Sequence, residues 1–279
     1  MKRELAKIAL IISGVKVIEI IVISMLTGFF AGFLGGLFGI GGGLIIVPVL
    51  LVLFKHQGFE QEIIMIIAVA TSLASVIFTA IASSLAHHRL GTLNWDKALQ
   101  MVPGIVIGVL SGAMLAELLA SNWLETVYAI FLIMVGLQMA FQLEPKQGSV
   151  KKSGVLDFVA SWVIGLVSSL VGIGGGSLTV PYLVSCRYPM RNAVAISSAC
   201  GIPIALAGAL SYLVLGWKAE GLPAWSLGYI YLPAFVGIVL LSMPAARLGA
   251  KWAYKLPAKH LKRYFSLLIF FMAAKLLFQ

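Results

Sequence analysis

The sequence predicts an all-α membrane protein that crosses the bilayer several times. Of its 279 residues, 61% are hydrophobic and only 11% are charged, and the mean hydropathy is +1.04. These values lie outside the range of soluble globular domains. Apolar runs recur along the whole chain, and several approach the roughly 20 residues that a helix needs to cross the hydrocarbon core. We therefore expect a polytopic protein surrounded by the lipid bilayer, without a sizeable soluble domain.

Eight apolar segments have about the length of membrane helices. They cover residues 17–38, 63–86, 98–119 and 124–142 in the first half, and 155–171, 193–216, 226–246 and 261–278 in the second. Two further apolar pieces, 44–54 and 177–185, are shorter. At 1.5 Å per residue, about 11 helical residues reach only some 16 Å, which is half of the hydrocarbon thickness. We expect these two pieces to be half-helices or re-entrant segments.

The chain is an internal duplication. Residues 38–50 read FGIGGGLIIVPVL and residues 171–183 read VGIGGGSLTVPYL, and AVATSLAS (68–75) corresponds to AVAISSAC (193–200). Each half would contain about five helical elements, and an odd number of crossings inverts the second copy relative to the first. We predict a first transmembrane repeat at 1–142 with an N-terminal extension at 1–16, a linker at 143–154 and a second repeat at 155–279.

The basic residues are those of a membrane protein rather than of a nucleic-acid-binding protein. The net charge is +10, but 13 of the 20 Lys and Arg residues lie in the loops at 87–97, 143–154, 187–191 and 247–263. With five elements per repeat these loops share one side, which the positive-inside rule makes cytoplasmic. The basic N-terminus then falls outside, unless residues 1–14 form an interfacial helix or an extra segment. We expect no nucleic-acid partner.

The repeated glycines predict breaks in two membrane helices. Three consecutive glycines cost about 1 kcal/mol each in a helix, whereas close packing needs only one per turn. We expect structural helix breaks at Gly39 and Gly172, each with a proline following, at Pro48 and Pro181. Either each short helix starts near its glycines and kinks at its proline, or it starts with the proline in its first turn. By contrast, Gly28, Gly32, Gly35 and Gly36 have the spacing of a close-packed helix face.

Two such breaks facing each other would form an anion site. Freed backbone groups in a membrane need partners inside the protein, and the start of a helix directs N–H groups and a positive dipole end at that point. Hydroxyl side chains cluster in the same segments. The predicted substrate-binding residues are Gly41, Gly42, Gly43, Thr71 and Ser72 in the first copy, and Gly174, Gly175, Gly176, Ser177, Thr179, Ser197 and Ser198 in the second.

The scarcity of ionisable side chains in the long segments also favours an anion site. The long segments contain few ionisable groups apart from Lys16, Glu19, Glu117 and Asp157, which lie near segment ends. We therefore expect neither a proton relay on a buried carboxylate nor a metal site, and no other cofactor. The sequence offers no nucleophile with a neighbouring base and only two cysteines, so we do not expect an enzyme. Because Ser177 and Thr179 replace Leu44 and Ile46, the second copy should supply more hydrogen bonds to the anion.

The duplicated G-I-G-G-G-x-x-x-V-P element, from Gly39 to Pro48 and from Gly172 to Pro181, resembles the TauE/SafE family of sulfite and organosulfonate exporters over residues 20–278. The resemblance implies two related halves in the inner membrane. It also implies secondary transport of a small sulfur-containing anion, such as sulfite or sulfoacetate, at a midplane site between the repeats. An anion channel of the same architecture is the alternative. The direction of transport, the coupling ion and the oligomeric state stay open.

Overall fold

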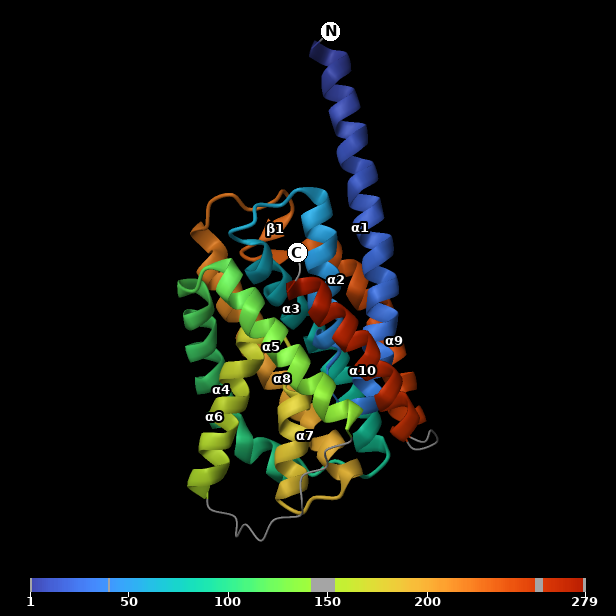
Figure 1. Ribbon diagram of the computed structural model, residues 1–279, viewed down its shortest axis with the longest axis vertical. Helices are drawn as coiled ribbons and strands as arrows, with labels where there is room; N and C mark the ends of the chain where they lie inside the picture. Colours follow the sequence, from blue (N-terminus) through green and yellow to red (C-terminus); the bar gives the residue numbers. More distant parts are fainter. Residues whose placement is uncertain (1, 40, 142–153, 254–257, 278–279) are drawn as a thin grey trace.

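The computed structural model describes residues 2–39, 41–141, 154–253 and 258–277 and is almost entirely helical (Figure 1). The helices of the first half are α1 (Lys2–Phe38), α2 (Gly43–Gln57), α3 (Ile64–Arg89), α4 (Trp95–Leu118) and α5 (Ser121–Ala140). Those of the second half are α6 (Gly154–Val171), α7 (Gly176–Ser185), α8 (Met190–Leu215), α9 (Leu232–Trp252) and α10 (Ala258–Leu277). A single 3-10 turn, Gly216–Lys218, follows α8 in this part of the chain.

The protein is a multi-pass membrane protein, as its sequence predicts. Within the described residues, seven helices are long and apolar enough to cross a membrane: the Val17–Phe38 part of α1, together with α3, α4, α5, α6, α8 and α9. The described apolar part of α10, Ser266–Leu276, is shorter. Large apolar side chains such as Leu118, Val155 and Phe271 are more than 70% exposed. Exposed apolar surface on this scale is suited to lipid rather than to water.

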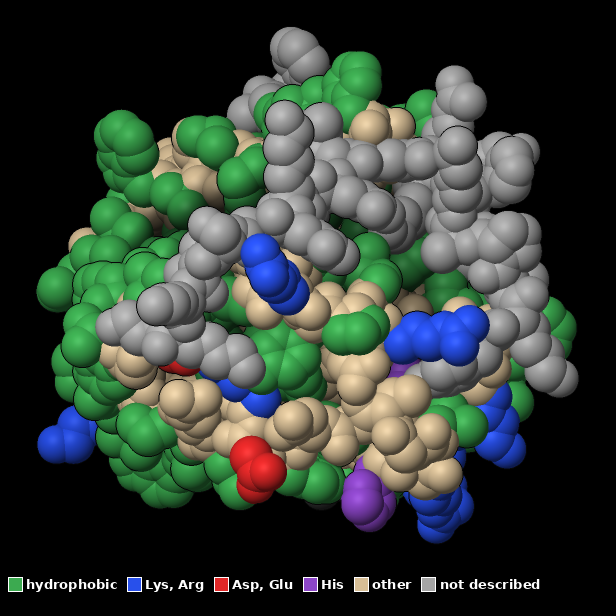
Figure 2. Space-filling view, turned by 90° about the horizontal axis from the view of Figure 1, so that it is seen from below, with side chains coloured by type: hydrophobic (Ala, Val, Ile, Leu, Met, Phe, Trp, Pro, Cys, Tyr) green, Lys and Arg blue, Asp and Glu red, His purple; other side chains and the backbone are tan. Residues whose placement is uncertain are grey.

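The two ends of the bundle carry opposite charge. Figure 2 looks onto the end where α3 meets α4 and α7 meets α8, and Lys and Arg side chains are spread over it. Exposed residues on this basic end are Arg89, Arg187, Arg191, Arg247 and Lys251. Exposed residues on the opposite, acidic end include Glu60, Glu62, Glu117 and Glu220. By the positive-inside rule the basic end would face the cytoplasm, and this orientation stays a prediction.

The halves are intertwined rather than side by side. Helix α1 of the first half packs along α9 of the second, and α4 packs along α6, while α3 crosses α8 and α5 contacts α10. On α1, Gly28, Gly32 and Gly36 lie so close to the backbone of α9 that a methyl group at any of them would overlap it. The close-packing interpretation of these glycines is therefore correct. Helices of one half thus pack against helices of the other, which agrees with a duplicated unit. The inversion of the second copy relative to the first stays a prediction.

The glycine runs interrupt the helices where the sequence predicts. Helix α1 ends at Phe38 and α2 begins at Gly43, and α6 ends at Val171 and α7 begins at Gly176. Gly39, Gly41 and Gly42 have φ between 72° and 83°, and Gly172 and Gly175 have φ of 73° and 75°. L-residues with a side chain rarely adopt this left-handed conformation, so glycine is needed here. Both short helices start at the glycines and contain their proline.

One expected membrane segment begins later than its apolar sequence suggests. Residues 226–231 of the predicted 226–246 segment form a hairpin of two short strands, β1 (Ser226–Leu227) and β2 (Ile230–Tyr231). Trp225 and Gly228 have positive φ, which stops a helix from starting earlier, and Pro233 lies in the first turn of α9. Proline favours that position because it needs no N–H partner there.

The predicted domain boundaries stay predictions. The linker at 143–154 lies outside the described residues except for Gly154, which begins α6. Residues 2–16 of the predicted N-terminal extension continue α1 without interruption, and Figure 1 shows this part of α1 projecting beyond the acidic end of the bundle.

A tyrosine from α5 compensates for the proline in α2. Pro48 has no N–H to donate to the carbonyl of Leu44, four residues earlier, so that carbonyl loses its helical partner. The hydroxyl of Tyr128, which is fully buried, donates to the Leu44 carbonyl over 3.4 Å. A backbone group inside the membrane is thus satisfied by a side chain from a neighbouring helix.

Tyr128→Phe should therefore lower the free energy of unfolding by about 1 kcal/mol, the cost of one buried hydrogen bond. In the Pro48→Ala background, the backbone supplies the N–H that proline lacks, so the same Tyr128→Phe change should cost much less. Unfolding of the four proteins in detergent measures the double-mutant cycle. Equal costs in both backgrounds would contradict the proposed compensation.

Candidate functional site

The two helix breaks face each other in the interior of the protein. A methyl group on Gly41 would lie 3.1 Å from the Cα atom of Gly174, and one on Gly43 would overlap the backbone at Gly172 and Ile173. The starts of α2 and α7 therefore approach the same region from the two halves. Only glycine allows the two backbones to come this close.

Each break is held by a serine from the other half. Ser72 on α3 donates to the carbonyl of Gly172 over 2.7 Å, and Ser197 on α8 donates to the carbonyl of Gly39 over 3.1 Å. The two serines correspond in the repeat alignment, and both side chains are fully buried. Their hydroxyls bond across the halves rather than back to the preceding turn of their own helix. These crossed bonds satisfy carbonyls that the breaks remove from helical pairing.

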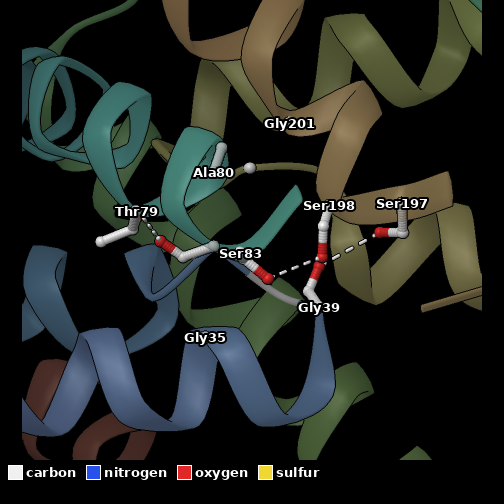
Figure 3. Close-up of a pocket in the computed structure, with 10 residues that line it drawn as sticks. Gly35, Gly39, Thr79, Ala80, Ser83, Ser197, Ser198 and Gly201 are labelled. Carbon is white, nitrogen blue, oxygen red and sulfur yellow. Dashed lines mark hydrogen bonds between the residues drawn. The ribbon is translucent and has the colours of Figure 1, made fainter. Parts of the chain in front are cut away.

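A small cavity lies beside the breaks, between α3 and α8 (Figure 3). Thr79 on α3 donates to the Gly41 carbonyl over 3.2 Å. Ser83 on α3 and Ser198 on α8 are joined by a 3.0 Å hydrogen bond across the cavity. The residues that line it are Gly35, Gly39, Gly41, Thr79, Ala80, Ser83, Gly174, Ser197, Ser198 and Gly201.

The accessible surface of the cavity is mostly apolar, although hydroxyl residues are among those that line it. Among the described residues, no charged side chain lines it, and the polar groups present are hydroxyls and backbone groups. Its volume is about 10 Å³, which is room for about one water molecule. An anion with three oxygen atoms does not fit into this space, so the helices around it must separate before such an anion binds.

The start of α7 carries buried donors that have no partner. Within the described residues, the backbone N–H groups of Gly176 and Ser177 donate to no other backbone group, and the same holds for Gly43 and Leu44 at the start of α2. The hydroxyls of Ser168, Ser177 and Thr179 are also buried and unpaired within this part of the chain. Buried polar groups are normally hydrogen-bonded, because leaving one unpaired costs about 1–3 kcal/mol. In the first copy, Leu44 and Ile46 take the places of Ser177 and Thr179, and both are apolar and fully buried.

The predicted site residues do not all come together. Gly41, Gly174, Ser197 and Ser198 line the cavity. Gly42 and Gly175 cap the two short helices, which Gly43 and Gly176 begin. Thr71 instead accepts a hydrogen bond from the backbone N–H of Tyr231 in β2, over 3.0 Å, and does not line the cavity. Whether these residues bind a substrate stays a prediction.

Sequence reasoning missed two of the hydroxyls in the cavity, Thr79 and Ser83. The signal for them is a repeat along α3: hydroxyl residues follow one another at every fourth position, at Thr71, Ser75, Thr79 and Ser83. Residues four apart share one face of a helix. All four side chains are at most 3% exposed, so this face lies in the interior of the bundle.

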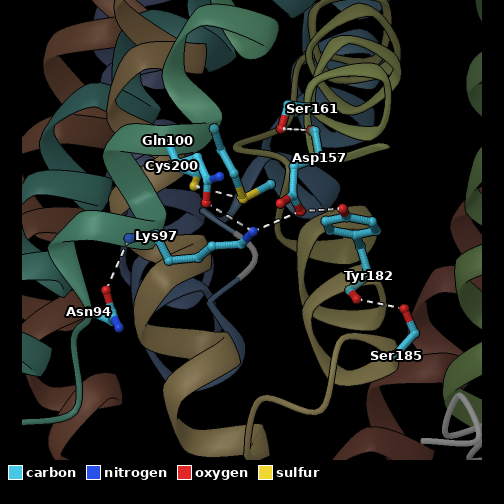
Figure 4. A network of polar contacts seen from close by, with 9 residues as sticks. Asn94, Lys97, Gln100, Asp157, Ser161, Tyr182, Ser185 and Cys200 are labelled. Carbon is cyan, nitrogen blue, oxygen red and sulfur yellow. Dashed lines mark hydrogen bonds and ion pairs between the residues drawn. The ribbon is translucent and has the colours of Figure 1, made fainter. Parts of the chain in front are cut away.

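A buried ion pair joins the starts of two helices, and Asp157 lies near a segment end, as the sequence indicates. Lys97 in the first turn of α4 and Asp157 in the first turn of α6 are each 3% exposed, and their Nζ and Oδ1 atoms lie 2.7 Å apart. Figure 4 shows the hydroxyl of Tyr182, on α7, donating to the same carboxylate oxygen over 2.5 Å. The side chain of Asn94 caps α4 by accepting a hydrogen bond from the Lys97 N–H. This cap fixes the start of α4 and so the position of Lys97 in its first turn.

Gly41→Ala should be far more destabilising than Gly58→Ala. Both glycines have positive φ, but a methyl group on Gly58 would meet nothing within 4 Å, whereas one on Gly41 would press on Gly174 and Val76. The backbone strain of about 1 kcal/mol is common to both changes, and overpacking adds about 1–3 kcal/mol at Gly41 only. Thermal unfolding in detergent measures the difference. Equal destabilisation would show that the two breaks are not in close contact.

Known proteins resemble the chain along most of its length. The sequence profile of the family described as sulfite exporter TauE/SafE matches residues 24–276. A probable membrane transporter protein of Haemophilus influenzae is 35% identical over 91% of this chain and 96% of its own length. A probable membrane transporter protein of Methanocaldococcus jannaschii is 32% identical over 85% of this chain and 88% of its own. No solved structure matches the chain.

These matches confirm the resemblance carried by the two glycine motifs. The family match extends from α1 to α10, and the relatives named above, both described as probable membrane transporter proteins, match the chain over most of its length. The chain is a membrane transporter that belongs to the TauE/SafE family.

Proposed function

We propose that the protein is a secondary transporter of small sulfur-containing anions, such as sulfite or an organosulfonate, in the inner membrane. The anion would bind near the midplane, between the two helix breaks. The observation that carries the proposal is the meeting of the two breaks, each held by a serine from the other half, beside a cavity lined by hydroxyls. The sulfur-containing substrate follows from the description of the family.

Backbone and hydroxyl donors suit an anion better than a cation. The starts of α2 and α7 bring two positive helix-dipole ends to the breaks, and N–H groups at a helix start bind oxyanions directly. At α7 the unpaired N–H groups and the hydroxyls of Ser177 and Thr179 add further donors. Cation binding would need carboxylate or carbonyl oxygens that are free to coordinate, whereas the carbonyls of Gly39 and Gly172 already accept hydrogen bonds.

The small size of the cavity favours a carrier over a channel. Where α3 crosses α8, Val76, Ala80 and Ala205 form a small apolar cluster beside the cavity. On the far side of the breaks, the side chain of Leu73 lies against Gly208 in the second half of α8. A carrier closes its site on one side in this way and opens it by moving one half against the other. An anion channel needs a continuous polar path instead.

Sulfite, sulfoacetate or another small sulfonate should raise the melting temperature of the purified protein, and acetate and formate should not. A ligand that binds only the folded state at 100 times its Kd stabilises it by about 2.7 kcal/mol. Ser198→Ala should weaken binding by about five- to tenfold through the loss of one hydrogen bond, and Ser83→Ala should act similarly. Ser211→Ala, whose hydroxyl bonds back to Ala207 on α8, is the matched control and should bind normally.

Stabilisation by carboxylates alone would contradict the proposed substrate class. In proteoliposomes, a carrier should exchange labelled anion across the membrane and accelerate when unlabelled anion is present on the opposite side. Fluxes that far exceed those of carriers, without such acceleration, would identify the protein as a channel.

Thr179→Val should affect stability and binding in opposite directions. The change removes a buried hydroxyl that has no partner among the described residues, so the ligand-free protein should become more stable, by about 1 kcal/mol. If the hydroxyl serves the anion, affinity for sulfite should fall at the same time. Thermal shifts with and without sulfite measure both effects, and unchanged affinity would remove Thr179 from the site.

A further inference from the structure

The buried pair of Lys97 and Asp157 joins the two halves of the transporter at its basic end. Lys97 belongs to α4 of the first half, and Asp157 belongs to α6 of the second. Gln100 accepts a further hydrogen bond from Lys97 Nζ over 3.3 Å. Ionisable groups buried within a membrane protein are costly, and those that persist commonly take part in ion or proton movement. The anion site described above gives this pair no role.

The pair is connected to the anion site through helix α7. Tyr182, which bonds to the Asp157 carboxylate, lies in a helix of only ten residues whose first turn begins at the second break. About one and a half helical turns, which include Pro181, separate Tyr182 from Gly176. On α8, the sulfur of Cys200 lies 4.0 Å from that of Met101 on α4, and Cys200 precedes Gly201, which lines the cavity (Figure 4). The carboxylate is therefore positioned to sense and to move the elements around the anion.

Charge balance gives this carboxylate a task. An entering anion brings negative charge into an interior of low dielectric, where no charged side chain among the described residues lines the cavity. Binding one proton to Asp157 makes its surroundings more positive by one charge, which offsets a singly charged anion. Protonation of Asp157 also weakens the hydrogen bond that its carboxylate accepts from Tyr182, and this bond attaches α7 to α6.

Other titratable groups at this end are arranged around the pair. Tyr182 on α7, Cys186 just after it and Cys200 on α8 are neighbours of the pair or of one another. Arg187 lies in the following loop, Arg191 begins α8, and α3 contributes His87 near Gly36. Within the described part of α4, α6 and α7, Asp157 is the only buried carboxylate at this end.

We propose that Asp157 binds the proton that is co-transported with each singly charged anion. The proton passes from water at the basic end to a carboxylate oxygen of Asp157. Once the anion has left, Asp157 releases the proton into the compartment that received the anion, so that anion and proton cross the membrane together. This inference rests on the proposed function, because it assigns the coupling ion of that transport.

The test uses the full chain in proteoliposomes, with the membrane potential clamped by K⁺ and valinomycin. Two fluxes are measured with labelled sulfite and labelled methanesulfonate, a sulfonate that stays ionised near neutral pH: exchange at equal pH, and net uptake with the outside more acidic by one pH unit. One proton per anion should give about tenfold accumulation of methanesulfonate, since one pH unit is a factor of ten in proton activity. Asp157→Asn should retain exchange at a reduced rate but should lose accumulation and the pH dependence of the flux.

Two further variants make the result decisive. The double variant Lys97→Met/Asp157→Asn removes both charges, so that no unpaired lysine is left buried. It serves as the test if Asp157→Asn alone does not fold, and it should likewise exchange anion without accumulating it. Asp96→Asn changes an exposed carboxylate in the same turn of α4 and should accumulate anion as the unmodified protein does. Accumulation by the double variant would overturn the coupling role of Asp157. So would exchange without accumulation in the unmodified protein, although the proposed function would then stand. If neither anion exchanges in the unmodified protein, the proposed substrate class is wrong and the coupling falls with it.

Discussion

The fold depends on one constraint: backbone groups released from a helix inside a membrane must find partners within the protein. The transporter interrupts two helices near its centre and satisfies this constraint with two crossed hydrogen bonds, from Ser72 to Gly172 and from Ser197 to Gly39. Each serine comes from the opposite half, so each break depends on the other copy for a partner, and Thr79 of the first half adds a further bond to Gly41. The close contact of Gly41 with Gly174 and the position of the cavity beside them follow from this arrangement.

Much of this arrangement could be predicted because the glycine motif and the serine-bearing helix that follows it occur twice in the chain. The duplicated motif located the breaks and the short helices, and the repeat alignment paired Ser72 with Ser197, which do the same work. Duplication also helps to separate the glycines of the breaks from Gly28, Gly32 and Gly36, whose spacing is that of helix packing. Local pattern sufficed wherever a residue's role depends on its immediate neighbours in the chain.

Contacts between distant residues could not be predicted in this way. Lys97 and Asp157 are 60 residues apart on different helices, and neither has a neighbour in sequence that reveals the other. Apolar composition extended the predicted 226–246 segment back to residue 226, although positive φ at Trp225 and Gly228 makes a hairpin there. Thr79 and Ser83 lie in a regular pattern, but that pattern also suits hydroxyls that only bond back to their own helix, and it became informative once Ser198 was placed opposite Ser83.

The exchanged packing of the helices has a consequence for how the protein is made. The glycine face of α1 finds its partner only in α9, since Gly28 meets Ile238 and Gly36 meets Ala246. At a synthesis rate of about 5–20 residues per second, the ribosome needs roughly 10–40 s to add the 200 or so residues between them. During that time the glycine face of α1 has no α9 to pack against. The first half therefore cannot complete its structure while it is being made, and the protein assembles only when the last helices enter the membrane.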